Sequence, residues 1–122
     1  MPTVLIVEDN EMNMRLFSDL LKTKKYRVIE CLEGKKALNI VKKMKPDLIL
    51  MDIQMPEISG LEVTAQIRKT PAVAGTKIIA VSAFAMKGDE ERILQAGCDA
   101  YISKPISIPL FFETVEKYLK EG

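Results

Sequence analysis

The stretch Leu48-Ile49-Leu50-Met51-Asp52 decides the fold, because four consecutive apolar residues end abruptly at a carboxylate. An earlier stretch, Val4-Leu5-Ile6-Val7, has the same pattern and is followed directly by Glu8-Asp9. A strand with one face in water alternates apolar and polar residues, whereas a strand that is apolar at every position is covered on both faces. The two stretches therefore predict central strands of a parallel sheet with helices on both sides.

The rest of the chain alternates between short strand-like runs and stretches with helical periodicity. Further strands are expected at residues 26–30, 78–81 and 100–102, with a short fourth helix at 91–96 and a fifth at 110–119. The expected apolar faces of the first three helices are Met12, Leu16, Leu20 and Leu21; Ala37, Leu38, Val41 and Met44; and Leu61, Val63, Ala65 and Ile67. This alternation predicts a doubly wound α/β fold, whose functional crevice lies beyond the carboxyl ends of the strands.

Length and charge limit the possible classes of protein. The 122 residues fit one domain, 1–122, with no room for an output domain, and the 18 basic and 17 acidic residues leave a net charge of +1. That balance gives no general attraction to nucleic acid or to a membrane surface. The N-terminus has no secretory pattern, and the longest weakly polar stretch, 78–86, is less than half of the roughly 20 residues that a membrane helix needs. We expect a cytoplasmic protein without an integral membrane segment.

The sequence contains no histidine and only two cysteines, Cys31 and Cys98, which are far apart. The lack of histidine excludes Ser-His-Asp and Cys-His catalysis, histidine-based zinc sites and a phosphohistidine carried by this chain. We interpret both cysteines as small apolar residues.

Chemically capable side chains follow four of the five expected strands. Glu8 and Asp9 follow the first, Asp52 the third, Ser82 the fourth, and Lys104 the fifth. Each one alone has a purely structural explanation as a helix cap or a solvated charge. Four independent caps have no reason to meet at one edge of a sheet, so their joint placement predicts a site for phosphoryl transfer.

The acidic residues of this group predict a metal ion. If the first and third strands are neighbours, their backbones lie about 5 Å apart, so Asp9 and Asp52 can share one hard cation with Glu8 alongside. Oxygen ligands alone select Mg²⁺, or Mn²⁺, over zinc. Three clustered carboxylates repel one another unless a divalent ion and the ammonium group of Lys104 offset their charge.

Asp52 is the predicted nucleophile. A carboxylate can attack phosphorus to form an acyl phosphate, while a metal ion and a lysine neutralise the oxygens of the transferred group. The loop after Asp52 can turn the backbone carbonyl of Gln54 toward the metal. The hydroxyl of Ser82 can donate a hydrogen bond to a phosphoryl oxygen.

These residues, taken together, resemble bacterial response-regulator receiver domains over essentially the whole chain. The sequence looks closest to the DivK-type single-domain regulators of the cell cycle, through residues 84–89 and its length. The resemblance implies a five-stranded sheet of flavodoxin-like order 2-1-3-4-5. The matching motifs are Val7-Glu8-Asp9-Asn10, Asp47-Leu48-Ile49-Leu50-Met51-Asp52, Met55-Pro56, Ser59-Gly60, Val81-Ser82-Ala83, Gly97 and Tyr101-Ile102-Ser103-Lys104-Pro105.

The resemblance also implies a role for each site residue. Asp52 is the phosphoacceptor, Asp9 and Glu8 surround Mg²⁺, with Glu8 acting through water, and Lys104 is the salt-bridge partner of the phosphoryl group. Ser82 senses that group, and the Lys104–Pro105 peptide bond is cis. The chain departs from the commonest pattern in having Glu8 in place of aspartate and Ser82 in place of threonine, and both changes keep the functional oxygen.

A two-state switch is part of the same implication, with Ser82 moving toward the phosphoryl group and Tyr101 turning inward behind it. The output surface would be formed by the fourth helix, fifth strand and fifth helix. We expect it to bind a downstream protein target, because no nucleic-acid reader is present. The donor must be external: a sensor histidine kinase, a phosphotransfer protein or a small acyl phosphate. The apolar residues expected there are Met86, Tyr101, Ile108, Phe111 and Phe112.

Other readings of the sequence stay open at this point. The chain could act as a phosphate shuttle within a phosphorelay, or as a receiver fold kept only as a scaffold. A Mg²⁺-dependent phosphohydrolase also uses an aspartate at a strand end, but such enzymes usually carry a second acid two residues later, where this chain has Gln54. A nucleotide or flavin module is disfavoured because Glu8-Asp9 replaces a glycine-rich loop.

Overall fold

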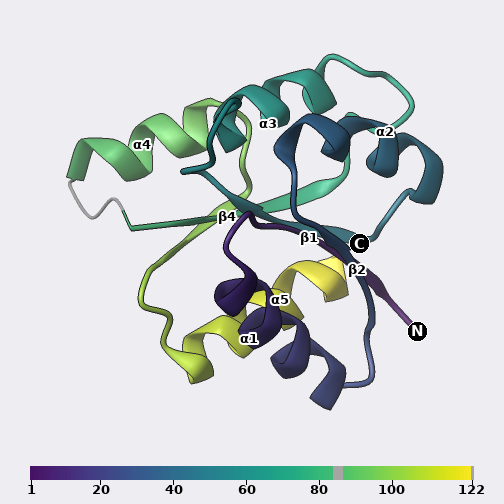
Figure 1. The fold of residues 1–122 in the computed structure, drawn as a ribbon, viewed down its shortest axis with the longest axis vertical. Helices are drawn as coiled ribbons and strands as arrows, with labels where there is room; N and C mark the ends of the chain where they lie inside the picture. The colour runs from purple at the N-terminus through teal and green to yellow at the C-terminus, as the bar shows by residue number, and fades with distance from the viewer. Residues whose placement is uncertain (84–86, 122) are drawn as a thin grey trace.

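A computed structural model describes residues 1–83 and 87–121, which form a five-stranded sheet between two layers of helices (Figure 1). All strand pairings are parallel, and the strand order is β2-β1-β3-β4-β5. Both the doubly wound architecture and the predicted order are confirmed. The strands are β1 (Thr3–Val7), β2 (Arg27–Cys31), β3 (Leu48–Asp52), β4 (Lys77–Ser82) and β5 (Ala100–Ser103).

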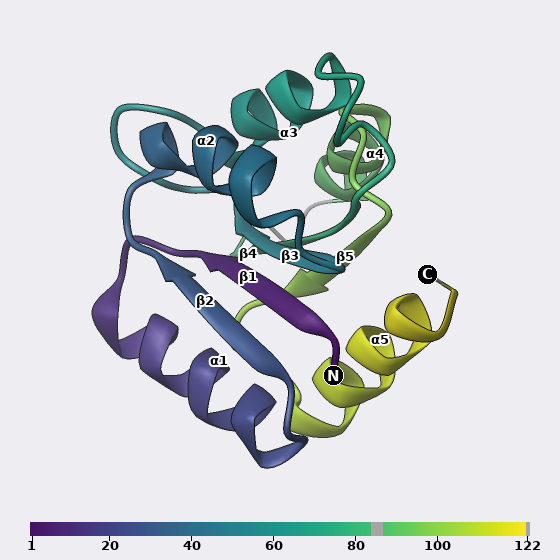
Figure 2. The same cartoon turned by 90° about the vertical axis from the view of Figure 1, so that its right-hand side faces the viewer.

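The helices are divided between the two faces of the sheet. Figure 2 shows α1 and α5 on one side and α2, α3 and α4 on the other. No helix among the described residues is both long and apolar enough to cross a membrane. The helices are α1 (Glu11–Thr23), α2 (Gly34–Met44), α3 (Gly60–Arg68), α4 (Lys87–Gln95) and α5 (Ile108–Glu121).

Strands β1 and β3 form the centre of the core, and residues 4–7 and 48–52 are buried throughout. Successive side chains of a strand point to opposite faces, so each strand supplies both layers. Leu5 and Ile49 pack beneath α2 and α3, whereas Ile6 and Leu50 pack on the side of α1 and α5. The uninterrupted apolar pattern of these strands therefore follows from two-sided burial.

The buried face of α1 differs from the predicted one. Of the four predicted residues, Leu21 is buried and Leu20 is partly buried, whereas Met12 is 83% exposed and Leu16 is exposed. Met14 and Phe17 are buried in their place. Asn10 caps the start of the helix, and its side chain accepts a hydrogen bond from the backbone N–H of Asn13.

The predicted face of α2 is correct for Ala37 and Val41, which are buried, and wrong for Met44, which lies exposed in the last turn. The fourth helix starts earlier than predicted, at Lys87. In α5, Phe111 and Val115 are buried.

Both cysteines are buried and form no disulfide, as predicted. The thiol of Cys31 donates to the backbone carbonyl of Glu33 at 3.0 Å, and the sulfur of Cys98 lies 3.7 Å from the hydroxyl of Thr64. Burial is the main cause that raises the pKa of each thiol, so both remain protonated.

Candidate functional site

The carboxyl edge of the sheet brings the predicted site residues together. Parallel pairing aligns the strand ends, because Val7 is opposite Met51, Asp52 is opposite Val81, and Ser82 is opposite Ser103. The residues that follow these ends therefore share one rim. This register explains why positions 8, 52, 82 and 104 become neighbours in space.

Three carboxylates form the centre of this rim. Glu8, Asp9 and Asp52 each offer a carboxylate oxygen, and these oxygens lie within 4.8 Å of one another. Glu8 is 1% exposed and Asp52 2% exposed, whereas Asp9 is open to solvent. Two buried acids beside an exposed one form a set of oxygen ligands that is compatible with Mg²⁺ at the mouth of the site.

Lys104, which follows β5, contacts both buried acids. Its ammonium group donates to Oε1 of Glu8 at 3.1 Å and to Oδ1 of Asp52 at 3.3 Å. The peptide bond between Lys104 and Pro105 is cis, as predicted. One cation paired with two buried carboxylates leaves negative charge uncompensated, which is the condition that favours a bound divalent ion.

The electrostatics of the site reflect this excess of negative charge. Burial, and then the neighbouring Glu8, raise the pKa of Asp52 from 3.8 to about 7, against the opposing effect of Lys104. Burial lowers the pKa of Lys104, but attraction to Asp52 and Glu8 outweighs burial, so the pKa lies above its ordinary value. The lysine therefore stays charged, while Asp52 resists ionisation without further positive charge.

The backbone of the β3–α3 loop holds Asp52 in place. The N–H of Gln54 donates to Oδ1 of Asp52 at 3.2 Å, and the N–H of Gly60 donates to the carbonyl oxygen of Ile53 at 3.1 Å. A Cβ atom at Gly60 would overlap the backbone carbonyl oxygen of Asp52. Only glycine fits there, a requirement that sequence reasoning missed because it depends on a close approach between a loop and a strand end.

Gln54 and Ser82 link the loops on either side of Asp52. The side-chain carbonyl of Gln54 accepts from the N–H of Ala83 at 3.3 Å, a contact that the sequence did not indicate. Ser82 is fully buried, and its backbone carbonyl accepts from the N–H of Lys104 at 2.8 Å. The residues after β3, β4 and β5 are thus tied together by hydrogen bonds.

The predicted output surface is only partly present. Phe111 is 0% exposed, and its ring stacks on Phe17 at 5.8 Å between centroids, so its placement on that surface is wrong. Phe112 is half-buried and lies against Phe111 and the ammonium group of Lys24. Tyr101 is half-buried and packs on the core, and Met86 lies outside the described residues. Phe111 faces the sheet, because burying its large aromatic ring there removes much apolar area from water.

A doubly wound parallel sheet with an acidic cluster, a buried hydroxyl residue and a lysine at its carboxyl edge defines the receiver class of signalling proteins. Residues 4–116 match the family described as the response regulator receiver domain, and the chain belongs to that family. It functions in phosphorylation-dependent signalling. This family membership favours the receiver interpretation over the hydrolase and nucleotide alternatives.

Relatives that match nearly the whole chain are response regulators too. The chain is 56% identical over 120 residues to the polar-differentiation response regulator DivK of Brucella anthropi, with 98% of each chain covered. The DivK protein of Brucella abortus (strain 2308) is equally similar.

Solved structures show the same fold. The receiver domain of the sensor histidine kinase PA1611 from Pseudomonas aeruginosa PAO1, solved with a magnesium ion in its active-site cleft, has a TM-score of 0.90, 31% identity and 98% coverage of each chain. The receiver domain of the Francisella response regulator 1452 has a TM-score of 0.93 at 25% identity, covering 99% of this chain and 98% of that one.

Proposed function

We propose that Asp52 accepts a phosphoryl group from an external donor and that the phosphorylated protein signals by binding another protein. The observation that carries this proposal is the contact of the nearly buried Asp52 with Lys104, beside the carboxylates of Glu8 and Asp9. No other cluster of three potential metal-ligating residues occurs among residues 1–83 and 87–121.

The metal ligands we propose are Asp9, Asp52 and the backbone carbonyl of Gln54, with Glu8 acting through water. The carboxylate cluster fits Mg²⁺, with Mn²⁺ as a substitute, and the magnesium-bound receiver domain of PA1611 supports the assignment. When bound, the ion supplies positive charge that favours ionised Asp52 and neutralises oxygens of the incoming phosphoryl group. Glu8 also keeps Lys104 charged and in place through their 3.1 Å contact.

The chemical step transfers one phosphoryl group. A carboxylate oxygen of Asp52 forms a bond to phosphorus, while the bond from phosphorus to the donor's imidazole nitrogen, or to the oxygen of an acyl phosphate, breaks. The leaving group retains the bonding electron pair. Lys104 pairs with the new phosphoryl oxygens, and the hydroxyl of Ser82 donates to one of them. Attack of water on phosphorus later releases phosphate and restores Asp52, so the protein catalyses its own modification and its removal without being a turnover enzyme.

Phosphorylation is proposed to change the packing near β4 and β5. Ser82 is fully buried next to the strand that carries Asp52, and Tyr101 occupies the neighbouring strand opposite Ala80. Tyr101 lines one cavity together with Glu90 and Leu94 of α4. Burial, and then the charges of Asp89 and Glu90, raise the pKa of Tyr101. A shift of Ser82 toward the phosphoryl group would leave space for Tyr101 to turn inward and alter the surface formed by α4, β5 and α5.

A cavity of about 460 Å³ beside Lys104 is the docking place that we propose for the donor protein. It lies between α1 and the segment that follows β5, and its lining includes the exposed apolar side chains of Leu16 and Ile108. We infer that a sensor histidine kinase or a phosphotransfer protein binds there and presents its phosphohistidine to Asp52. Exposed apolar side chains next to a reactive group are a common mark of a protein-binding surface.

The cellular role we propose is control of the cell cycle or of cell division in the cytoplasm. Its support is the 56% identity, over nearly the whole length, to proteins named for polar differentiation. The same comparison supports a single receiver domain spanning residues 1–122, because 98% of each relative is covered.

Intact-mass measurement tests the phosphoacceptor. With Mg²⁺ and acetyl phosphate, the protein should gain one alkali-labile phosphoryl group, and EDTA or Asp52→Asn should abolish the gain. Asp19→Asn is the matched control, because Asp19 is an exposed acid whose ion pair with Arg15 is long, at 3.9 Å. An adduct that persists in Asp52→Asn would refute the assignment, and steady turnover of phosphate monoesters without an adduct would support a hydrolase instead.

A further inference from the structure

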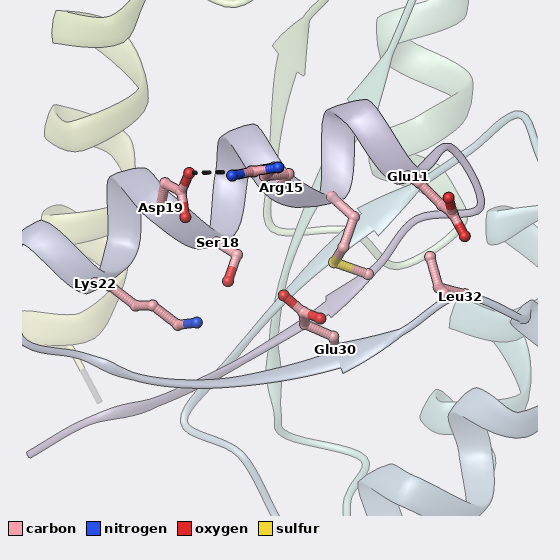
Figure 3. Close-up of a pocket in the computed structure, with 8 residues that line it drawn as sticks. Glu11, Arg15, Ser18, Asp19, Lys22, Glu30 and Leu32 are labelled. Atoms are coloured by element: carbon pink, nitrogen blue, oxygen red, sulfur yellow. Dashed lines mark ion pairs between the residues drawn. The ribbon is translucent and has the colours of Figure 1, made fainter.

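A second cavity, of about 320 Å³, lies between α1 and β2, and Figure 3 shows the side chains around it. It contains none of the residues placed in the phosphoryl-acceptor site. Its lining includes the apolar side chains of the buried Met14 and the exposed Leu32, and its volume is that of a small-molecule site. The lining residues are Glu11, Met14, Arg15, Ser18, Asp19, Lys22, Glu30 and Leu32.

Ser18 is the unusual member of this lining. Ser18 is 2% exposed, and its hydroxyl is the one buried side-chain polar atom without a hydrogen-bond partner in the part of the chain that the structure describes. Figure 3 shows this hydroxyl directed from α1 into the space between α1 and β2, with Lys22 on one side and Glu30 on the other. A buried hydroxyl without a partner costs free energy, so its retention in a cavity indicates a group that binds to it.

The charged side chains of the cavity are unevenly paired. Arg15 and Asp19 form an ion pair with each other on the outer side of α1. Lys22 and Glu30 extend into the space between α1 and β2, and neither forms an ion pair within residues 1–83 and 87–121. An unpaired ammonium group and an unpaired carboxylate therefore lie on either side of the Ser18 hydroxyl.

We propose that this cavity binds a small zwitterion, namely a free α-amino acid with an aliphatic side chain. The ligand's ammonium group pairs with Glu30, its carboxylate pairs with Lys22, and one of the two also hydrogen-bonds to Ser18. Its aliphatic side chain covers Met14 and Leu32. Since Arg15 and Asp19 pair with each other, the remaining charges of the lining are the carboxylates of Glu11 and Glu30 and the ammonium group of Lys22. A ligand that carries both charges fits this mixture best.

The test uses the full chain and three probes that differ in one charge each. L-Leucine carries both charges, N-acetyl-L-leucine lacks the ammonium group, and L-leucinamide lacks the carboxylate. In ¹⁵N-resolved NMR titrations up to about 10 mM, the range of a weak millimolar site, leucine should shift the amide signals of Ser18, Lys22 and Glu30 in a saturable way. Each blocked probe should bind at least about tenfold more weakly, because it leaves one charged group unpaired.

Variants separate the cavity from general effects. Ser18→Ala, Glu30→Gln and Lys22→Gln should each weaken leucine binding by about tenfold. Glu62→Gln and Lys42→Gln, which change exposed side chains on α3 and α2, should leave the affinity unchanged. Ser18→Ala removes only an unpaired hydroxyl, so it should fold and accept phosphate on Asp52 at the normal rate.

Three outcomes would overturn the proposal. One is the absence of a saturable shift with leucine, which would mean that water alone satisfies Ser18. Another is equal binding of all three probes, which would indicate apolar contact without charge recognition. The third is unchanged binding in Ser18→Ala together with Glu30→Gln. Because the phosphorylation of Asp52 is measured separately, failure of this proposal leaves the phosphoacceptor assignment intact.

Discussion

The ammonium group of Lys104 lies 3.3 Å from Oδ1 of Asp52, although 52 positions separate the two residues in the sequence. The same group also reaches Glu8, so one largely buried cation holds two buried acids together. Removal of a single partner from a buried ion pair leaves its charge uncompensated, and the resulting cost usually exceeds the net gain from the pair. The contact therefore serves both the chemistry of Asp52 and the stability of the edge of the sheet.

Lys104→Met should slow the formation of the phosphoryl adduct by at least about tenfold, because one source of transition-state charge is lost. It should also lower the free energy of unfolding by about 2 kcal/mol at pH 8, and by less at pH 6, where Asp52 can take up a proton. Urea unfolding at the two pH values measures the difference, with the exposed Lys42→Met as control. Equal losses at both pH values would contradict this account.

Asp52 makes the stability of the metal-free protein depend on pH. Its pKa is about 7 in the folded protein and 3.8 without the fold, so the folded state holds more protons between these values. Stability should be unaffected by this group below about pH 4, should fall as pH rises toward 7, and should level off above it. Asp52→Asn should remove this slope and raise the free energy of unfolding above pH 7 by on the order of 2 kcal/mol.

In the unsubstituted protein, Mg²⁺ should reverse the loss of stability between about pH 4 and pH 7, because binding of the ion to the folded state favours ionised Asp52. Thermal unfolding at pH 5 and pH 8, with Mg²⁺ or EDTA, provides the measurement. Mg²⁺ should raise the melting temperature at pH 8 much more than at pH 5, and it should have little effect on Asp52→Asn. A slope of the same size in that variant would show that other groups control the dependence on pH.

Gly60 and Gly75 form a matched pair for testing the backbone of the site. A Cβ atom at Gly60 would overlap backbone atoms of Asp52 and Ile53, whereas one at Gly75 would meet nothing within 4 Å. Gly60→Ala should therefore cost about 2 kcal/mol or more and displace Asp52, with loss of the phosphoryl adduct. Gly75→Ala should be neutral or slightly stabilising. Chemical unfolding and intact mass test both variants, and a harmless Gly60→Ala would disprove the close approach.

The features that depend on sequence pattern were predictable, and those that depend on long-range packing were not. The apolar runs that end at Glu8 and Asp52 indicated central strands, and parallel strands place their carboxyl ends at one edge by geometry alone. The buried face of α1 is harder to predict, because residues 11–23 hold two overlapping apolar stripes. Ser18 interrupts the stripe that is buried, so the pattern favoured the exposed one through Met12. Contact with the sheet, which the sequence does not reveal, selects between them.

The same limit applies to the parts of the site that hold other residues in position. The need for glycine at position 60 and the contact between Gln54 and Ala83 arise only when two loops meet. An aromatic residue in α5 suits either a partner surface or the core, and Phe111 lies in the core. Residue type alone does not distinguish these environments, whereas the orientation of the helix does.

Arg68 at the end of α3 shows how much of the fold rests on such contacts. Its guanidinium group donates to the carbonyl oxygens of Gly97, Ala74 and Thr76 at 2.9, 2.8 and 2.6 Å, and to Oδ2 of Asp99 at 3.0 Å. These partners belong to the loops before β4 and before β5. One side chain therefore ties α3 to the two loops that lead into the adjacent strands β4 and β5.

Arg68→Met should lower the free energy of unfolding by about 2–4 kcal/mol, because four acceptors lose a charged donor in a half-buried place. Arg68→Lys should recover less than half of that loss, since an ammonium group cannot match the planar fork that reaches several carbonyls at once. The control is Arg15→Met, which breaks an exposed ion pair and should cost less than about 0.5 kcal/mol. Urea unfolding measures all three variants. If Arg68→Met costs no more than Arg15→Met, the carbonyl cluster around Arg68 does not hold β4 and β5 in place.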